Sequence, residues 1–311
     1  MGKRKKKDST KILKRILISL IAVIVLLVGV GIFYIYNVLG KIEKTEINKE
    51  DLGIVKEESG KDITNIVLFG VDVPKGQTGR SDSIMILSLD KAHKKIKLTS
   101  IMRDSYVNIP GRGMDKINHA YAFGGPQLAI KTLNTNFGLN IENFLTVNFT
   151  SLPLIIDKIG GVDINLTNGD LKYLNQHLGN KSTPVNGTGI HTLDGEQAMA
   201  YCRIRYDGGD QRRTERHRTV LEAVLKKIKE VPASKIPGII TDLLPYVETN
   251  YSSTEILGLG TSNMSLLNTD MVQYRLPEDG KYQGKNIKGV YYTVFDIKET
   301  KNDLKKFIYE N

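Results

Sequence analysis

Arginine is concentrated in one short stretch of a chain that otherwise favours lysine. Six of the twelve arginines fall in the sixteen residues from Arg203 to Arg218, against 32 lysines in the whole sequence. A guanidinium is planar, always charged, and binds two oxygens of a phosphate or carboxylate at once. The run therefore predicts a site for a highly charged anion. The alternative is a solvated face whose arginines pair with Asp207, Asp210 and Glu215.

The spacing within the run suggests how such a site is built. If residues 201–206 are extended, Arg203 and Arg205 point the same way. The glycine pair that follows then allows a tight turn, with Asp210 capping a helix that carries Arg213. Because a helix N-terminus itself attracts anions, arginines in its first turns predict a pocket of pyrophosphate size.

A second group of polar residues stands at the ends of apolar runs. Asp72 follows one such run, Asp82 precedes a second, and Arg103 follows a third. If these runs are neighbouring strands, the three side chains converge at one sheet edge, where ligands of open α/β sheets commonly bind. Two carboxylates beside substrate phosphates suit Mg²⁺ or Mn²⁺. The alternative is that the aspartates are ordinary turn residues.

Between these groups lies a segment of small and polar residues, 116–125, followed by an apolar helical pattern. Lys116 and Asn118 can reach phosphate oxygens, whereas core packing explains the apolar residues at least as well as a groove does. The sequence contains no P-loop, GxSxG, HExxH or paired CxxC motif, and its five histidines are scattered. A Ser-His-Asp hydrolase or a zinc enzyme is therefore poorly supported.

Strand and helix patterns alternate along the rest of the chain. Strands are predicted at residues 63–71, 84–89, 96–102, 144–149, 162–166, 271–276 and 290–295. Helices are predicted at residues 126–137, 152–159, 195–201, 213–230, 254–267 and 298–309. The strands at 84–89 and 96–102 form a hairpin, Asp194 caps the third helix, and 168–189 is an exposed loop. The alternation predicts an α/β fold, a three-layer α-β-α sandwich around a mixed central sheet.

The N-terminus carries a separate signal. Residues 16–40 contain no charged side chain, and residues 1–15 hold eight bases and one acid. About 20 apolar residues span a bilayer, and the positive-inside rule leaves the basic flank in the cytoplasm. We therefore expect a cytoplasmic tail at 1–15, a transmembrane helix at 16–40, an extracellular stalk at 41–62 and an extracellular domain at 63–311. A cleaved signal peptide is disfavoured because the apolar run is too long.

Charge and cysteine content limit the outer domain further. Beyond residue 15 the chain has 36 bases and 33 acids, so its net charge is only +3. A nucleic-acid-binding domain is expected to be broadly basic, and here the excess is local. The single cysteine, Cys202, forms no internal disulfide, which suits a bacterial cell surface.

Six motifs, in order along residues 63–230, resemble those of the LytR-CpsA-Psr family. They are Asn65-Ile-Val-Leu-Phe-Gly-Val-Asp72, Arg80-Ser-Asp82-Ser83, Ser100-Ile-Met-Arg103-Asp104, and the segments from Lys116 to Gly125, from Leu193 to Arg205 and from Gly209 to Arg213. Departures are small: Met102 stands where proline is usual, and His119 where a small residue is common.

The resemblance implies an α-β-α sandwich outside the membrane of a Gram-positive bacterium. Members of this family move a glycopolymer, of teichoic acid or capsule type, from an undecaprenyl-pyrophosphate carrier to a muramic acid hydroxyl of peptidoglycan. The new linkage is a phosphodiester. The resemblance also implies pyrophosphate contacts from Arg80, Arg103, Arg203, Arg205 and Arg213, to which we add Lys116 and Asn118 as candidate contacts from their place in the sequence. Asp72 and Asp82 are implied to bind Mg²⁺, and a groove lined from residues 116–160 to take the polyprenyl tail.

We expect Asp82, Arg103, Arg203 and Arg205 to be the catalytic residues. Phosphoryl transfer needs mainly positioning and charge stabilisation, which an arginine clamp with Mg²⁺ supplies. The base for the acceptor hydroxyl is not assigned: Asp82 is one candidate and a metal-polarised hydroxyl is another. The carrier pyrophosphate supplies the driving energy, so neither nucleotide nor nucleic acid is expected.

Three other functions remain open at the level of the sequence. A polyprenyl-pyrophosphate phosphatase would use the same pocket, with water as the acceptor. A non-catalytic scaffold would bind anionic wall polymer or lipid head groups without turnover. A transcriptional regulator is disfavoured by the predicted topology and by the charge of the outer domain.

Overall fold

The computed structural model describes residues 43–54, 62–71, 79–148, 151–205, 209–230, 246–266, 269 and 271–310. Within these ranges no helix has the length and apolar character needed to cross a membrane. The predicted cytoplasmic tail, the predicted transmembrane helix at 16–40 and Asp72 lie outside the described residues. The membrane anchor therefore stays a prediction.

A mixed seven-stranded sheet forms the centre of the described chain, in the order β1-β10-β7-β2-β3-β4-β11. The strands are β1 (Glu43–Lys44), β2 (Ile63–Val71), β3 (Ser81–Asp90), β4 (Lys95–Ile101), β7 (Asn143–Asn148), β10 (Val247–Thr249) and β11 (Met271–Leu276). β2 is parallel to β7, β4 is parallel to β11, and β3 runs antiparallel to both of its neighbours. One edge therefore collects the carboxyl ends of β2, β4, β7 and β11 and the start of β3.

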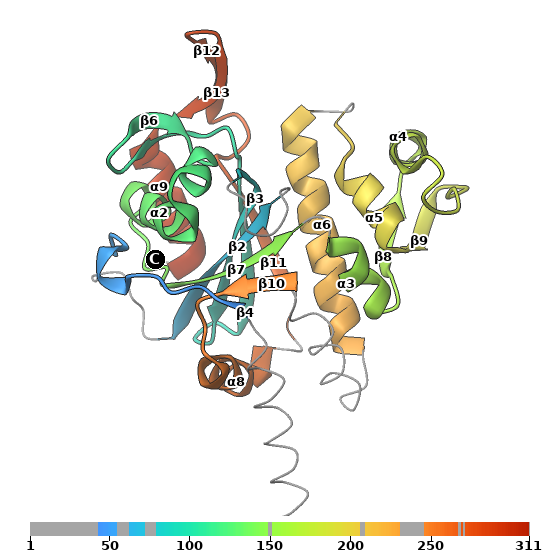
Figure 1. Ribbon diagram of the computed structural model, residues 1–311, viewed down its shortest axis with the longest axis horizontal. Helices are drawn as coiled ribbons and strands as arrows, with labels where there is room; N and C mark the ends of the chain where they lie inside the picture. Colours follow the sequence, from blue (N-terminus) through green and yellow to red (C-terminus); the bar gives the residue numbers. More distant parts are fainter. Residues whose placement is uncertain are drawn as a thin grey trace, which may run out of the picture.

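Among the described residues, three two-stranded sheets lie outside this seven-stranded sheet. They are β5–β6 (Tyr106–Ile109 and Gly113–Lys116), β8–β9 (Val162–Leu166 and Gly189–Leu193) and β12–β13 (Tyr282–Ile287 and Val290–Phe295). The β12–β13 hairpin projects from the body of the domain at the top of Figure 1.

Helices cover both faces of the sheet. Along β2, Val67 and Phe69 point to one face and Ile66 and Leu68 to the other, as the two-residue period of a strand requires. The first face packs against α2 (His119–Phe137) and α9 (Ile297–Tyr309). The second face is covered by α8 (Ser253–Ser262) and, beside β4, by α6 (Gly209–Glu230). The α/β fold with a mixed central sheet is confirmed.

A second hydrophobic core lies on the far side of α6. It joins α6 to α3 (Leu152–Lys158), α4 (Asn168–Leu178), α5 (Gly195–Cys202) and the β8–β9 sheet. Figure 1 shows α6 standing between the sheet and this group of elements. Because α6 contacts both groups, residues at its N-terminus are held against the edge of the sheet.

The exposed loop predicted at 168–189 is wrong, because α4 occupies its first half. Thr167 and Asp170 form a capping box: the Thr167 hydroxyl accepts from the Asp170 amide at 3.2 Å, and the Asp170 carboxylate accepts from the Thr167 amide at 3.0 Å. Leu174 and Leu178 then fall on one helix face and are buried in the second core. A Thr-x-x-Asp start followed by leucines four apart was a helix signal in the sequence.

Part of the predicted stalk packs against the domain. β1 pairs with β10 in parallel, and the short 3-10 helix η1 (Lys49–Asp51) follows it. Leu52 is fully buried in the core, and its carbonyl accepts a hydrogen bond from Asn134 Nδ2 at 2.9 Å. Residues 43–54 therefore contribute to the folded unit that was predicted to begin at residue 63.

Candidate functional site

Asp82 and Arg103 meet at the edge of the sheet that the sequence predicted. The β3–β4 register pairs Ile84 with Ile101, so Asp82 and Arg103, two residues beyond each, stand opposite one another. Arg103 Nη1 donates to Asp82 Oδ1. On its other side β3 pairs Ser81 with Val71 and Ser83 with Gly70, which makes Asp82 the extra residue of a β-bulge. Bulges of this kind re-aim a side chain, often beside an active site.

The arginine run folds differently from its prediction, yet reaches the predicted place. Residues 201 and 202 are the last turn of α5 and Arg203 is its helical C-cap, so the expected extended segment at 201–206 is wrong. Arg203 and Arg205 are both exposed, and both line one pocket. The described lining of that pocket is Asp82, Met199, Cys202, Arg203, Arg205, Arg213 and His217.

The N-terminus of α6 supplies a third arginine to the pocket. The helix begins at Gly209, so Asp210 lies inside the first turn and is not the predicted N-cap. Arg213 is only 3% exposed, and its Nη2 lies 3.5 Å from the Asp82 carbonyl oxygen and 4.0 Å from Asp82 Oδ1. Helix α6 therefore places a buried guanidinium directly against the bulged end of β3.

The buried groups beneath the arginines are uncharged. Burial, together with the neighbouring Arg213, lowers the pKa of His217 to about 3, and its Nε2 lies 3.2 Å from the Cys202 carbonyl oxygen. Burial raises the pKa of the Cys202 thiol to about 12. Since a nucleophilic cysteine needs a lowered pKa, Cys202 does not act as a thiolate at neutral pH. The positive charge of the pocket is therefore that of its arginines.

Other arginines of the run have structural partners. Arg216 donates to Asp170 Oδ1 from Nη2 at 2.8 Å and from Nε at 3.2 Å, with both side chains buried. Arg212 is exposed, and its Nη1 lies 3.3 Å from Glu215 Oε2. The predicted alternative, a solvated face paired with nearby acids, holds for Arg212 and Glu215, whereas Arg216 pairs in the interior with the distant Asp170 and Arg203, Arg205 and Arg213 line the pocket.

The remaining predicted contacts lie beside the pocket. Lys116 Nζ binds Asp104 Oδ1 at 2.5 Å, and Arg103 Nε lies 3.7 Å from the other oxygen of Asp104. Asn118 is 3% exposed, and its backbone N–H donates to the Arg103 carbonyl oxygen at 3.3 Å. Arg80 is exposed two residues before Asp82. The structure thus keeps these residues near Arg103 without placing them in the described lining, and their roles stay predictions.

The apolar residues predicted as core by default are buried. Ile117, Ala120 and Ile130 belong to the cluster between the sheet, α2 and α9. The groove for a polyprenyl tail along residues 116–160 stays a prediction.

Asp82 is the one described carboxylate of the two predicted metal ligands. Arg103 and Arg213 both approach Oδ1 of Asp82, and among the described residues Oδ2 is not engaged by either. Mg²⁺ is commonly bound by one or two carboxylates together with substrate phosphates. Asp82 therefore supplies one of the carboxylates that Mg²⁺ would need. The second predicted ligand, Asp72, lies outside the described residues.

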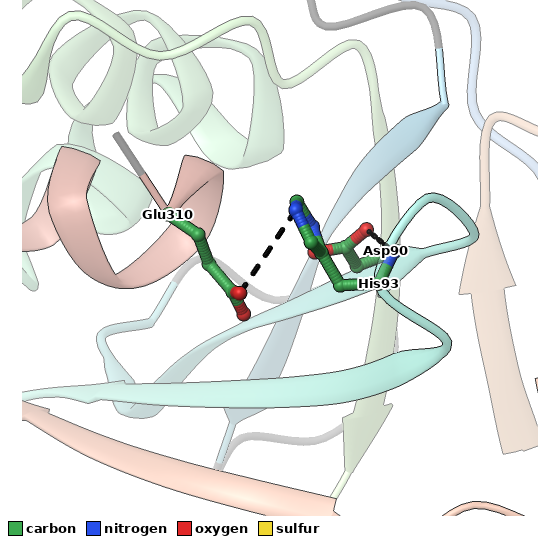
Figure 2. A group of neighbouring side chains, drawn as sticks. All are labelled: Asp90, His93 and Glu310. Carbon is green, nitrogen blue, oxygen red and sulfur yellow. Dashed lines mark hydrogen bonds and ion pairs between the residues drawn. The ribbon is translucent and has the colours of Figure 1, made fainter.

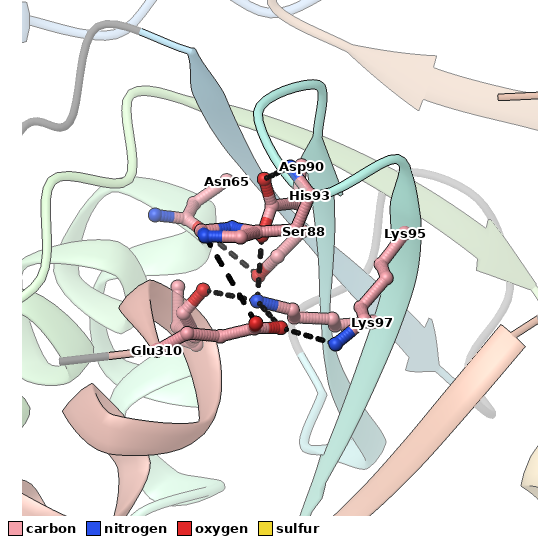
Figure 3. A network of polar contacts seen from close by, with 8 residues as sticks. Asn65, Ser88, Asp90, His93, Lys95, Lys97 and Glu310 are labelled. Atoms are coloured by element: carbon pink, nitrogen blue, oxygen red, sulfur yellow. Dashed lines mark hydrogen bonds and ion pairs between the residues drawn. The ribbon is translucent and has the colours of Figure 1, made fainter. Parts of the chain in front are cut away.

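A second polar cluster lies at the opposite end of β3. Asp90, His93 and Glu310 place potential metal-ligand atoms within 4.8 Å of one another, as Figure 2 shows. The buried ammonium of Lys97 already lies there, 2.6 Å from Asp90 Oδ2, 2.9 Å from Glu310 Oε1 and 2.7 Å from the Ile308 carbonyl oxygen (Figure 3). A lysine therefore supplies the positive charge that a metal would bring, and the cluster ties α9 to the sheet.

Three residues of the pocket lining were missed from the sequence. His217 follows Arg213 by four residues on α6, and Met199 precedes Arg203 by four at the end of α5. Residues four apart share a helix face, so this spacing was a usable signal once the helices were placed. Cys202 lines the pocket because α5 extends to it.

Comparisons with known proteins agree with this arrangement. The family description LytR_cpsA_psr matches residues 30–307. The polyisoprenyl-teichoic acid–peptidoglycan teichoic acid transferase TagU of Oceanobacillus iheyensis is 33% identical over 305 residues, covering 90% of this chain and 89% of that protein. The regulatory protein MsrR of Staphylococcus aureus is 34% identical over 226 residues, covering 71% of this chain and 67% of that protein.

A solved structure shows the same fold with a lipid. The LytR-CPS2A-psr family protein YwtF (TagT), with bound octaprenyl pyrophosphate lipid, superposes with a TM-score of 0.63 at 27% identity, covering 85% of this chain and 94% of that chain. The family match spans nearly all of the described domain, and the motifs at 80–83, 193–205 and 209–213 supply six of the seven residues of the described pocket lining. The chain belongs to the LytR-CpsA-Psr family.

Proposed function

We propose that this protein is a membrane-anchored phosphotransferase that moves an anionic glycopolymer from a polyprenyl-pyrophosphate carrier to a hydroxyl of peptidoglycan. The observation that carries the proposal is the convergence of Arg203, Arg205 and Arg213 on Asp82 and its partner Arg103. The transferase name of the TagU relative and the octaprenyl pyrophosphate bound to the solved homologue support the same substrate class.

The arginines act on the phosphates. Arg203 and Arg205 are exposed and can turn toward a diphosphate, while Arg213 is fixed beneath it by burial. Charge-assisted hydrogen bonds from guanidinium groups hold two oxygens at once, and they stabilise the charge that develops on the leaving phosphate. Because little covalent chemistry is asked of the protein in phosphoryl transfer, this clamp supplies most of the catalysis.

The step breaks the phosphoanhydride bond of the carrier pyrophosphate and forms one new phosphate ester bond. The acceptor oxygen attacks the phosphorus that carries the polymer, and the bond from that phosphorus to the bridging oxygen breaks. The polymer is then joined to the acceptor by a phosphodiester, and the polyprenyl monophosphate leaves with the bridging oxygen. The hydroxyl proton is taken by Asp82, which lines the pocket, or is released to solvent from a hydroxyl that a divalent cation polarises.

A divalent cation belongs to the proposal. Asp82, and Asp72 as the predicted second ligand, would hold Mg²⁺, or Mn²⁺ in its place, beside the phosphates. Bound there, the ion would neutralise phosphate charge and lower the pKa of a coordinated hydroxyl. Arg203 and Arg205 can contact the phosphates directly, so donor binding without metal is expected to be weakened but not lost.

The donor lipid requires access from a membrane. We propose that residues 16–40 anchor the chain, with residues 1–15 in the cytoplasm and the domain outside, as the charge pattern predicts. The acceptor is then also on the outer side.

A transfer assay tests the proposal. Full-length protein in detergent is incubated with a labelled polyprenyl-pyrophosphate glycopolymer, Mg²⁺ and a peptidoglycan oligomer. Arg103→Ala and Arg203→Ala should each lower kcat by about a hundredfold or more, as loss of one charge-stabilising donor does. Arg212→Ala should keep kcat, because Arg212 is exposed and outside the described lining.

Product analysis separates transfer from hydrolysis. The proposal expects the label on the peptidoglycan oligomer. Label released as free phosphorylated polymer at the same rate with and without acceptor would show a phosphatase instead. Full transfer by both pocket variants would contradict the site.

A further inference from the structure

One carboxylate beside the pocket is shared by two cations. Asp104 is 9% exposed, Lys116 Nζ donates to its Oδ1 at 2.5 Å, and Arg103 Nε lies 3.7 Å from its Oδ2. Arg103 in turn donates from Nη1 to Asp82, which lines the pocket. The charges of Asp82, Arg103, Asp104 and Lys116 therefore alternate in sign along one row that starts at the pocket.

The backbone around Asp104 is held from two sides. The Asp104 carbonyl oxygen accepts a hydrogen bond from the Thr293 N–H in β13 at 2.9 Å. The Asn118 N–H donates to the Arg103 carbonyl oxygen at 3.3 Å, which holds the end of β6, where Lys116 stands, against the turn that carries Asp104. The place of this carboxylate is thus set by the fold and does not depend on a ligand.

The ammonium of Lys116 is ordered by two contacts. Besides the Asp104 carboxylate, the ring of Tyr292 lies against it, with Nζ 5.7 Å from the ring centroid. The Lys116 side chain is only 16% exposed. A long lysine side chain loses much rotamer freedom when a site requires it in one position, which weakens binding unless the chain is ordered beforehand. Asp104 and Tyr292 order it beforehand.

The two cations on either side of Asp104 suit a ligand with two linked phosphates. An ammonium carries several N–H donors and a guanidinium carries more, so a contact with one carboxylate does not exhaust either group. Two phosphates that share a bridging oxygen can each take one of two neighbouring cations. A single phosphate cannot use both in the same way.

We infer that Asp104 is a positioning residue that holds Arg103 and Lys116 side by side for the two phosphates of the donor, and so favours a diphosphate over a monophosphate. The inference rests on the proposed function, in which the donor is a polyprenyl pyrophosphate and the leaving product is a polyprenyl monophosphate. A site with this preference binds the donor and releases the spent carrier. Asp104 acts through the two cations and does not itself contact a phosphate.

The charge of Asp104 has the opposite effect, so the two effects can be told apart by sign. A carboxylate beside an anion site repels phosphate, and it repels a diphosphate more strongly because a diphosphate carries more negative charge. If Asp104 acted by its charge alone, Asp104→Asn would tighten diphosphate binding and increase the preference over monophosphate. Positioning predicts the reverse, because without the carboxylate the two long side chains lose their common partner.

The affinities for two lipids test the inference. Full-length protein in detergent, at one fixed Mg²⁺ concentration, is titrated with polyprenyl pyrophosphate and with polyprenyl monophosphate of the same chain length. We expect Asp104→Asn to weaken diphosphate binding about tenfold and monophosphate binding less than about twofold. Lys116→Met removes one of the positioned cations and should show the same selective loss, so it keeps the test valid if Asp104→Asn does not fold. The double variant should lose less than the two single losses combined, because both changes remove one contact.

Glu215 provides a matched control. Its carboxylate is also shared by two cations, with Arg212 Nη1 at 3.3 Å and Arg275 Nη1 at 3.1 Å, and it lies two residues from Arg213 on α6. Glu215→Gln removes the same charge as Asp104→Asn but leaves the Asp104 carboxylate in place. It should therefore not lower the preference for the diphosphate.

The outcomes separate this inference from the proposed function. A preference for the diphosphate that is unchanged or increased in Asp104→Asn overturns the inference, and so does an equal loss of affinity for both lipids. If Arg203→Ala/Arg205→Ala loses diphosphate binding while Asp104→Asn does not, the inference alone fails. If neither variant binds the diphosphate differently from wild type, the proposed function fails with it.

Discussion

Arg213 and Arg216 lie three residues apart on α6 and have different partners. Arg213 faces Asp82 at the edge of the sheet, and Arg216 pairs with Asp170 in the second core. Burial opposes the ionisation of Asp170, but hydrogen bonds from Thr167 and Arg216 outweigh it and lower the pKa of its carboxyl. The arginine-rich run is thus a mixture of pocket-lining and structural side chains, and their partners distinguish them, because Arg213 and Arg216 are both buried.

Acid should destabilise the domain through His217. Its pKa falls from 6.5 to about 3 on folding because of burial and Arg213. Between these values the unfolded chain binds a proton that the folded chain does not, so stability falls as pH drops from about 6.5 toward about 3, by up to about 1.4 kcal/mol per unit. Replacing the imidazole with an amide that does not titrate should flatten this dependence.

Urea unfolding of His217→Gln and wild type across that pH range measures the effect. His191→Gln is the matched control, because His191 lies in β9 with its Nε2 2.8 Å from the Gly187 carbonyl, outside the pocket lining. If the free energy of unfolding fell equally steeply with decreasing pH in wild type and His217→Gln, the lowered pKa of His217 would be contradicted.

The sequence predicted which site residues meet only where it also predicted which strands are neighbours. Asp82 and Arg103 were placed at one edge because each adjoined an apolar run, and the β3–β4 register confirms that they meet. His217 was not predicted, because its importance comes from burial under Arg213, and burial is a property of the tertiary structure. Lys97 was missed for the same reason: a fully buried lysine looks like any other lysine in the sequence.

Helix α6 connects the sheet to the second core, so its buried ion pair should matter for stability. Arg216→Ala would leave Asp170 buried without its guanidinium partner, at a cost of about 3 kcal/mol. Arg212→Ala, four residues earlier on the same helix, should cost less than about 1 kcal/mol because its pair with Glu215 is exposed. Chemical denaturation of the two variants compares them directly, and equal losses would contradict the structural role of Arg216.

Elements with a regular apolar period were predicted well, and short or polar ones were not. The boundaries of β2, β8, β11 and β13 match their predictions. β10 has three residues and β12 is mostly polar, so neither carries the alternation that marks a strand. The extended segment at 201–206 failed because α5 ends at Cys202 with Arg203 as its cap, although both arginines still reach the pocket.

The candidate site and a buried polar cluster lie at the two opposite ends of the sheet, which predicts a separation of function from stability. The arginine pocket lies at the start of β3, and the Lys97 cluster lies at its end, where Asp90 and Glu310 join the sheet to α9. Burial disfavours a charged Asp90, but hydrogen bonds from Lys97 and His93 prevail and lower the pKa of its carboxyl. Changes in this cluster should therefore affect folding and leave the pocket intact.

Lys97→Met tests that separation. The variant would leave Asp90 buried without the ammonium that neutralises it, so we expect a loss of about 3 kcal/mol in the free energy of unfolding. Lys95→Met also removes a contact to Glu310, but Lys95 is 45% exposed, so the loss should stay below about 1 kcal/mol. Folded Lys97→Met, at low temperature, should retain wild-type donor affinity; a selective loss of that affinity would contradict the separation.

The central claim is that the pocket beside Asp82 binds a diphosphate through its arginines. The most direct measurement is the Kd of full-length protein in detergent for a polyprenyl pyrophosphate. Arg203→Ala/Arg205→Ala removes two charges from the pocket, and Arg212→Ala/Lys226→Ala removes two from the exposed face of α6. We predict binding at least about tenfold weaker for the first variant and unchanged for the second. Equal affinity for wild type and both variants would contradict the claim.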